Sequence, residues 1–413
     1  MEPIQWINTR ENFQTKHQDE KVTRKALTIL LPHFRHSPFY FIEQNIRTLD
    51  PNHPDQNAHV TEAPRIMSII TETLGNIRMD EPLAYRKLTL FPLVRPVDGP
   101  PEYLTLDQAM ADSSIKLSEV SESGNVPDIR FENTGSKPTL LVDGEEISGG
   151  KQNRILNISI LAPAKETITI PVTCVEAGRW GRHDSAYRRE RDRILRSRHR
   201  AEFEEADHIA FMRMRRAKHV AVTENLKVAG SRYASQPLVW SEIEDLHGDM
   251  GTRSPTRAMR DSYENHRQSL EEYVQALPAV KNQVGVVFAL NNQPVGLDLF
   301  DHPHTLSRIL PKLVRSHAME ALREPESVAE VASTGAARDF IGEIIDAATT
   351  RYPAIGEGED LRLESNLIVG GGLEARERLI HLCAFVEDSK PKGPTRSRQS
   401  RFWTHRSASR RPN

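Results

Sequence analysis

The segment DGEEISGGKQNRILNISILAPAKETITIPVTCVEAGRW, residues 143–180, contains two strand-like apolar stretches, 154–161 and 166–173. The short connection between them suits a tight turn that joins antiparallel strands. In such a hairpin the start of the first strand lies beside the end of the second strand. We therefore expect residues 151–154 to lie close to residues 176–180.

Other strand-like stretches occur on both sides of this hairpin, at 87–94, 138–142, 283–290, 293–300, 361–369 and 378–386. The pair Asn291–Asn292 separates two of them, and asparagine tolerates the left-handed backbone that a tight hairpin requires. Helical patterns are found at 183–228, 263–277, 305–322 and 325–349. Because strands do not alternate strictly with helices, a doubly wound sheet is not expected. We predict an α+β fold with a strand-rich mixed or antiparallel core and several helices.

The length of 413 residues is enough for two domains, or for one large domain with extensions. We predict three parts. Residues 1–85 form an N-terminal extension or small subdomain, which includes the loop-like stretch DPNHPDQNAH at 50–59. Residues 86–387 form the α+β domain. Residues 388–413 are rich in lysine and arginine, and we expect a disordered tail there.

The composition excludes several classes of protein. A formal net charge of −2 gives the chain no strong electrostatic attraction to nucleic acid or to a membrane. Neither a signal-peptide pattern nor a run of about 18 apolar residues is present, so we expect a soluble, cytoplasmic protein. The two cysteines, Cys174 and Cys383, lie in apolar stretches and are predicted to be buried. Two cysteines exclude a disulfide framework and a cysteine-based zinc site, and the N-terminal histidines lack metal-ligand spacing, so no metal is expected.

Polar residues that could carry chemistry concentrate in the opening segment. The predicted catalytic residues are the carboxylates Glu145, Glu146 and Glu176. Such carboxylates can divide acid and base roles when their environments separate their pKa values. The predicted ligand-binding residues are Asp143, Lys151, Gln152, Asn153, Arg154, Arg179 and Trp180. Arginine and lysine can hold a phosphate, and tryptophan can stack on a base. The alternative is a solvated network of ion pairs without a ligand.

Two groups outside this segment are also candidates. The first consists of Asp298, Asp301, His302 and His304. An Asp/His group can bind metal or act as a base, but capping of the following helix is the favoured interpretation. The second consists of Gln236 and Trp240, which either line the same pocket or pack in the core.

The combination DGEE…GGKQNR…ExGRW in residues 143–180 resembles the signature of the ARPP-1 family. That family is named for its association with ADP-ribosylglycohydrolases and rhodanese-phosphatase superfamily proteins. Further matches are QPLVW (236–240), NQVGVVFALNNQPVGLDLFDHP (282–303) and LIHLCAF, which ends at Phe385. The resemblance covers about residues 86–387. It implies a role in the metabolism of NAD and ADP-ribose, and it strengthens the functional interpretation of the opening segment.

Three functions compete. The first is an enzyme that cleaves a glycosidic or phosphate linkage in an NAD-derived or ADP-ribose-type nucleotide. The second is a non-catalytic sensor of such a nucleotide. The third is an interaction protein that uses the Arg-rich stretch 187–200 and the basic tail, although a solvated helix face is favoured over nucleic-acid binding there. The sequence identifies neither a cofactor nor an oligomeric state. Motifs of P-loop NTPases, Rossmann dehydrogenases and α/β-hydrolases are missing.

Overall fold

The structure is a computed structural model that describes residues 68–121, 127–178, 203–324 and 331–387. These residues all belong to one compact unit that begins at Ile66. The tail 388–413 and most of the predicted subdomain 1–85 lie outside the described residues.

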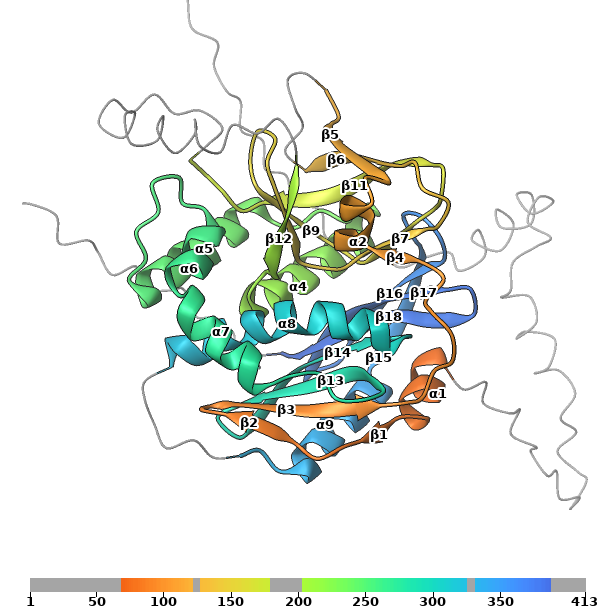
Figure 1. Ribbon diagram of the computed structural model, residues 1–413, viewed down its shortest axis with the longest axis vertical. Helices are drawn as coiled ribbons and strands as arrows, with labels where there is room; N and C mark the ends of the chain where they lie inside the picture. Colours follow the sequence, from red (N-terminus) through yellow and green to blue (C-terminus); the bar gives the residue numbers. More distant parts are fainter. Residues whose placement is uncertain (1–67, 122–126, 179–202, 325–330, 388–413) are drawn as a thin grey trace, which may run out of the picture. The chain divides into compact units, whose positions relative to one another are not determined.

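The largest sheet in the described part of the chain has nine antiparallel strands (Figure 1). Its strands are, in spatial order, β1 (Arg78–Met79), β3 (Leu88–Val94), β13 (Gln283–Leu290), β14 (Gln293–Phe300), β18 (Arg378–Val386), β17 (Ile368–Ala375), β16 (Glu359–Glu364) and β15 (Ala348–Pro353), with β2 (Leu83–Tyr85) on β3. The turn between β13 and β14 has Asn291 at φ 48° and Asn292 at φ 67°. The predicted hairpin at 283–300 is therefore confirmed. Because β1 and β2 pair with β3, the folded unit extends upstream of residue 86.

A six-stranded sheet carries the segment that opens the sequence analysis. In spatial order it consists of β12 (Glu204–Ile209), β8 (Glu145–Ser148), β9 (Arg154–Leu156), β11 (Thr167–Cys174), β6 (Asp128–Asn133) and β5 (Ile115–Glu119). The predicted strand 154–161 is divided between this sheet and a smaller one. The smaller sheet consists of β10 (Ile160–Ala162), β7 (Thr139–Leu141) and β4 (Leu104–Thr105). β9 still pairs antiparallel with β11, and Arg154 lies opposite Cys174 as the predicted hairpin requires.

Helices fill the space between the sheets and cover the outer face of the large sheet. The helices of the described residues are α1 (Ile69–Gly75), α2 (Leu106–Ala111), α4 (Met212–Ala229), α5 (Gln236–Met250), α6 (Met259–Asn265), α7 (Arg267–Ala276), α8 (Pro303–Arg323) and α9 (Thr334–Asp346). α8 packs on β13 on one side and on β12 on the other, so it lies between the two large sheets (Figure 1). α1 and α9 pack on a second apolar cluster of the nine-stranded sheet.

This arrangement confirms the predicted α+β fold, and three predicted elements need correction. The predicted helix 183–228 contains β12, whose residues Ala206 and His208 are buried, before α4 begins at Met212. The predicted strand 361–369 turns at Ser365, whose hydroxyl accepts backbone hydrogen bonds and so separates β16 from β17. The predicted helix 325–349 narrows to α9, which is followed by β15.

Both cysteines are free and buried, as predicted. Among the described residues, no helix has the length and apolar character needed to cross a membrane.

Because α8 lies between two sheets, substitution of one of its buried residues tests how much the packing of the core contributes to stability. We expect Leu313→Ala, which removes a fully buried side chain, to lower the free energy of unfolding by about 2–5 kcal/mol. Val228→Ala is the control, because Val228 on α4 is 84% exposed and should change stability by less than about 0.5 kcal/mol. Urea unfolding measures both. Equal losses for the two variants would contradict the layered core.

Candidate functional site

A buried carboxylate, Asp143, connects the opening segment to helix α4. Its oxygens accept hydrogen bonds from Arg215 Nε at 3.1 Å, from His219 Nε2 at 3.1 Å and from Lys218 Nζ. Burial raises the pKa of Asp143, but the charge of Lys218 and the contacts of His219 outweigh burial and hold the pKa well below its usual value. Asp143 is therefore ionised and fully engaged with protein groups.

Arg215 joins Asp143 to the large sheet. Its two terminal nitrogens lie 3.0 and 2.7 Å from the two carboxylate oxygens of Asp298 on β14. Burial raises the pKa of Asp298, but Arg215 and the hydrogen bond from His381 lower it to about 2. Gly371 on β17 has no side chain at a point where a Cβ would lie 2.9 Å from His219, so the strand leaves room for the α4 histidine.

The neighbouring carboxylates Glu145 and Glu146 have different partners. Glu145 accepts a hydrogen bond from the backbone nitrogen of Val142 at 2.8 Å and pairs with Lys312 of α8 at 2.7 Å. Lys312 also pairs with Glu205 of β12. Glu145 therefore connects β8 to α8 and is enclosed there.

Glu146 forms a buried pair with His208. Its oxygens lie 2.9 Å from His208 Nε2 and 2.9 Å from Asn153 Nδ2. The His208 ring stacks on Tyr263, with the ring centres 4.0 Å apart. Burial lowers the pKa of His208, but the charges and hydrogen bonds of Glu146 and Asp207 outweigh burial and raise the pKa. A carboxylate thus orients an imidazole that can hold a proton near neutral pH.

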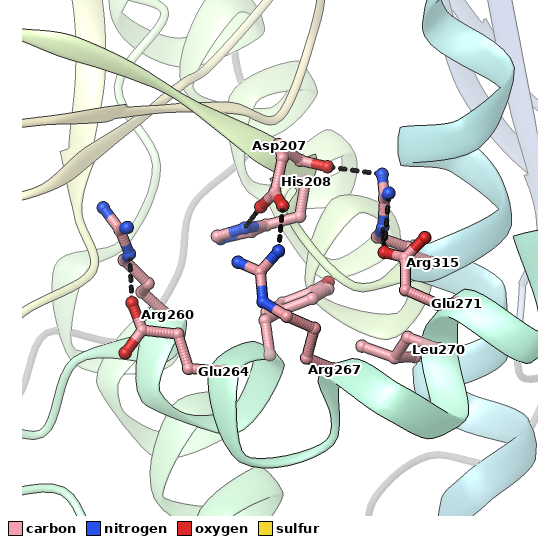
Figure 2. Close-up of a pocket in the computed structure, with 9 residues that line it drawn as sticks. Asp207, His208, Arg260, Glu264, Arg267, Leu270, Glu271 and Arg315 are labelled. Atoms are coloured by element: carbon pink, nitrogen blue, oxygen red, sulfur yellow. Dashed lines mark hydrogen bonds and ion pairs between the residues drawn. The ribbon is translucent and has the colours of Figure 1, made fainter.

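His208 borders a small pocket lined by three arginines (Figure 2). Each arginine faces an acidic side chain in Figure 2: Arg260 pairs with Glu264, Arg267 with Asp207, and Arg315 with Glu271. The pocket has a volume of about 10 Å³, which is room for a water-sized molecule and not for a nucleotide. We call it the arginine pocket.

The remaining described residues of the opening segment form a second buried group around Glu176. Gln152 Nε2 donates to the backbone oxygen of Glu176 at 3.2 Å, and the backbone nitrogen of Asn153 donates to Glu176 Oε2 at 3.2 Å. Arg154 is completely buried and holds both oxygens of Glu119 at 3.0 Å. The backbone nitrogen of Lys151 donates to Glu119 at 3.0 Å.

The structure therefore brings Gln152 and Asn153 to Glu176, as the hairpin geometry predicts, whereas Asp143 contacts α4 and Glu145 contacts α8. The three predicted catalytic carboxylates and Arg154 are all buried and engaged with protein groups. Arg179 and Trp180 lie outside the described residues, as does the Arg-rich stretch 187–200. The assignment of catalytic and ligand-binding roles to these residues stays a prediction.

A larger pocket adjoins the end of the opening segment, and we call it the α5 pocket. It has a volume of about 210 Å³ and is lined by Ala177, Trp240, Ile243, Glu244, His247, Thr252, Ser254 and Arg257. The wall at Ala177 is held in place because Glu176 bridges to Ala258 and the Gly178 nitrogen donates to Thr256 at 2.7 Å. A Cβ on Gly178 would lie 2.8 Å from the Thr256 backbone, so this close approach requires glycine.

Two features of the α5 pocket are suited to a ligand. His247 Nε2 is buried and has no hydrogen-bond partner among the described residues, while Nδ1 lies 2.9 Å from the Ser262 hydroxyl. Because that hydroxyl donates to Thr252, Nδ1 carries the proton and Nε2 offers a lone pair. Arg257 is exposed and has φ 54°, a backbone conformation that non-glycine residues rarely adopt and that often marks functional sites.

Sequence reasoning missed most of the α5 pocket. Trp240 is a candidate from the sequence, whereas Ile243, Glu244 and His247 are not. These three residues follow Trp240 at helical spacings of three and four residues, a signal that could have identified them. That spacing places all four on one face of α5. Gln236, the other sequence candidate, instead exchanges two hydrogen bonds with the Cys174 backbone.

The group after β14 has structural contacts. Asp301 accepts a hydrogen bond from Tyr103, and His302, not Asp301, caps α8 by accepting from the His304 nitrogen at 3.0 Å.

Burial raises the pKa of Cys174 to about 11, so this thiol is protonated at neutral pH and is a poor nucleophile.

Two buried groups have the residue types of a metal site: Asp143, His219 and Cys383, and Asp298, His381 and Cys383. Their hydrogen bonds oppose that role. His219 Nδ1 lies 3.3 Å from Arg362, which only donates, so the proton of His219 is on Nε2, the atom that a metal would need. Both oxygens of Asp298 are held by Arg215. We therefore interpret both groups as parts of the ion-pair network.

The fold defines the class of protein: an α+β domain whose antiparallel sheets enclose a network of buried charged side chains. The chain belongs to the ARPP-1 family, because the model of the ARG and Rhodanese-Phosphatase-superfamily-associated Protein domain matches residues 76–385. A search of the curated proteins and a search of the solved structures each found no match.

The buried histidines predict a loss of stability in mild acid. Burial lowers the pKa of His219 and of His317 to about 4, against about 6.5 in the unfolded chain. Between these values only the unfolded state takes up the protons, so stability falls as pH drops from about 6.5 to about 4, by up to about 3 kcal/mol per histidine. His208, whose pKa is raised, is already protonated in the folded state above this range, so its contribution to stability changes little as the pH falls from about 6.5 to about 4.

Urea midpoints between pH 7 and pH 4 measure the effect. We expect His317→Gln to reduce the pH dependence, because it removes one of the two groups that must stay neutral. A wild-type midpoint that is constant or rises over this range would contradict the prediction.

Proposed function

We propose that the chain binds an NAD-derived or ADP-ribose-type nucleotide in the α5 pocket. The observation that carries the proposal is the set of side chains on one helix face and its adjoining loop. This set combines an aromatic ring, a carboxylate, an acceptor imidazole and an arginine without a described acidic partner: Trp240, Glu244, His247 and Arg257. Each of the four matches one part of a nucleotide.

The aromatic and cationic ends of the pocket have separate roles in this proposal. Trp240 is 39% exposed, so its indole offers a surface on which a base can stack. Arg257 is exposed at the pocket lining and can hold a phosphate through two hydrogen bonds. A base and a phosphate bound together distinguish a nucleotide from a simple aromatic ligand or a free anion.

The polar groups of α5 suit the sugar and the base edge. The exposed carboxylate of Glu244 accepts hydrogen bonds, as a ribose diol requires. The lone pair of His247 Nε2 accepts from a hydroxyl or an exocyclic amino group, and binding would satisfy an atom that is otherwise buried without a partner. A ligand without such a donor would leave His247 Nε2 buried without a hydrogen bond, which costs free energy.

The α5 pocket also connects the proposal with the ligand-binding residues predicted from the sequence. Ala177 lines the pocket, and Arg179 and Trp180 follow Gly178 directly in the sequence. The ligand-binding roles of these two residues stay predictions from the sequence. Lys151, Gln152, Asn153 and Arg154 then support the wall of the site.

Binding without turnover, as in a sensor, is the function that the geometry supports best. Glu145, Glu146 and Glu176 are buried and hydrogen-bonded to other elements, so in this state they hold the framework and do not face a ligand. A hydrolase of a glycosidic or phosphate linkage is the second candidate. The observation that favours it is the Glu146–His208 pair beside the arginine pocket, where the imidazole could move a proton.

The binding proposal predicts separable losses. Trp240→Ala should weaken ADP-ribose binding by about 5- to 150-fold, as loss of a stacked base requires, and Arg257→Ala by about 10- to 100-fold. Isothermal titration calorimetry with ADP-ribose, NAD and AMP measures both. Tyr233→Ala is the matched aromatic control, because Tyr233 is also 39% exposed and lies outside the pocket lining. Arg253→Ala is the matched cation control. Absence of binding, or equal losses in the controls, would sink the proposal.

The hydrolase candidate predicts a different variant effect. Glu146→Gln keeps the side-chain volume but cannot hold His208 as an imidazolium, so it should lower any hydrolysis of a bound nucleotide by about 10²–10⁴-fold and leave its affinity unchanged. Chromatography of ligand incubated with each variant measures turnover. Glu224→Gln is the control, because Glu224 on α4 is exposed and lines neither pocket. If wild-type protein binds ADP-ribose but releases no product, the sensor interpretation stands and the hydrolase is excluded for that ligand.

The interaction-protein hypothesis rests on residues 187–200 and 388–413, which lie outside the described residues, and it stays a prediction.

A further inference from the structure

A serine, a histidine and an aspartate from distant parts of the chain form a row of hydrogen bonds at the junction of the sheets. Ser159 is located between β9 and β10, where the chain passes from the six-stranded sheet to the smaller one. Its Oγ lies 2.7 Å from His381 Nδ1, and His381 Nε2 lies 3.3 Å from Asp298 Oδ1. His381 is on β18 and Asp298 on the neighbouring strand β14.

The direction of the hydrogen bonds follows from the ionised carboxylate. Asp298 only accepts, because its pKa is about 2, so the proton of a neutral His381 is on Nε2 and points to Asp298. Nδ1 then carries a lone pair, and the Ser159 hydroxyl donates to it. The backbone nitrogen of Asp143 also donates to Ser159 Oγ at 2.9 Å, which holds that oxygen in position beside His381.

The histidine and the aspartate are held rigidly, whereas the serine is open to solvent in part. Arg215 fixes both oxygens of Asp298, and the His381 ring stacks on Phe300 with the ring centres 4.6 Å apart. His381 and Asp298 are at most 1% exposed, while Ser159 is only half-buried. A general base and its orienting carboxylate are thus enclosed behind a partly exposed serine.

We propose that Ser159, His381 and Asp298 form a nucleophilic triad that hydrolyses small carboxylic esters. Nδ1 of the imidazole contacts the serine, and Nε2 contacts the carboxylate. Either ring nitrogen can act as the base when the other one is held by a carboxylate. This activity is separate from nucleotide binding in the α5 pocket and does not depend on it.

The reaction balances without a cofactor. Ser159 Oγ forms a bond to the ester carbonyl carbon as its proton passes to His381 Nδ1. The tetrahedral intermediate then breaks its bond to the alkoxy oxygen, which leaves as an alcohol with the proton from His381. Water attacks the acyl-enzyme in the same way, loses a proton to His381 and releases the carboxylic acid, and the proton returns to Ser159.

A fluorophosphonate tests the triad directly, because an activated serine displaces fluoride and keeps the phosphonyl group. The full chain is incubated with the reagent, and intact-mass and peptide mass spectrometry locate the adduct. We expect one adduct per chain, on Ser159, and a labelling rate in His381→Gln at least about 100-fold below wild type. Both Ser159→Ala and His381→Gln should also lose hydrolysis of p-nitrophenyl acetate.

Ser114→Ala is the matched control, since Ser114 is also a partly buried loop serine but donates to a backbone oxygen and has no described histidine partner. It should label and hydrolyse at the wild-type rate. Mapping the adduct on the wild-type chain needs no variant, so a misfolded variant would not hide the answer. Native protein that does not react, or an adduct on other serines alone, would overturn the proposal and show that these contacts only join the sheets.

Discussion

The guanidinium of Arg215 is the point at which three separate parts of the chain meet. It binds Asp143 beside β8 and Asp298 on β14, and it is presented by α4. Moving charges out of water is costly, and a buried ion pair is tolerated only when each partner is satisfied. The sheets and α4 must therefore adopt one mutual arrangement, because a shift of any of them would leave a buried charge without its partner.

This constraint explains why the opening segment resembles an active site. Closely spaced carboxylates, amides and cations are what both catalysis and a buried ionic framework require. In the structure the consecutive residues Glu145 and Glu146 connect β8 to α8 and to β12 respectively, which secures two interfaces with one short strand. The α5 pocket and the partly exposed Ser159, where we propose function, lie at the margins of this framework.

Local signals in the sequence predicted local geometry. Asn291 and Asn292 specify their hairpin by backbone preference, and the antiparallel pairing that brings Arg154 beside Cys174 follows from a short turn. The partners of Asp143 could not be predicted in this way, because Arg215 and Asp298 are distant in sequence and a single sequence does not record which charges meet. The division of the stretch 154–161 was also hidden, since it depends on which sheet each half joins.

The order of strands in the large sheet has a consequence for biosynthesis. β3 pairs with β13, and β14 pairs with β18, so the centre of the sheet joins segments from both ends of the described chain. Contacts between such distant segments slow folding, because a long loop must close before they form. On the ribosome, β14 has no outer neighbour until β18 emerges as the last strand of the sheet. Nascent chains should therefore expose the apolar edge of β14 while residues 301–377 are synthesised, and depend on chaperones during that interval.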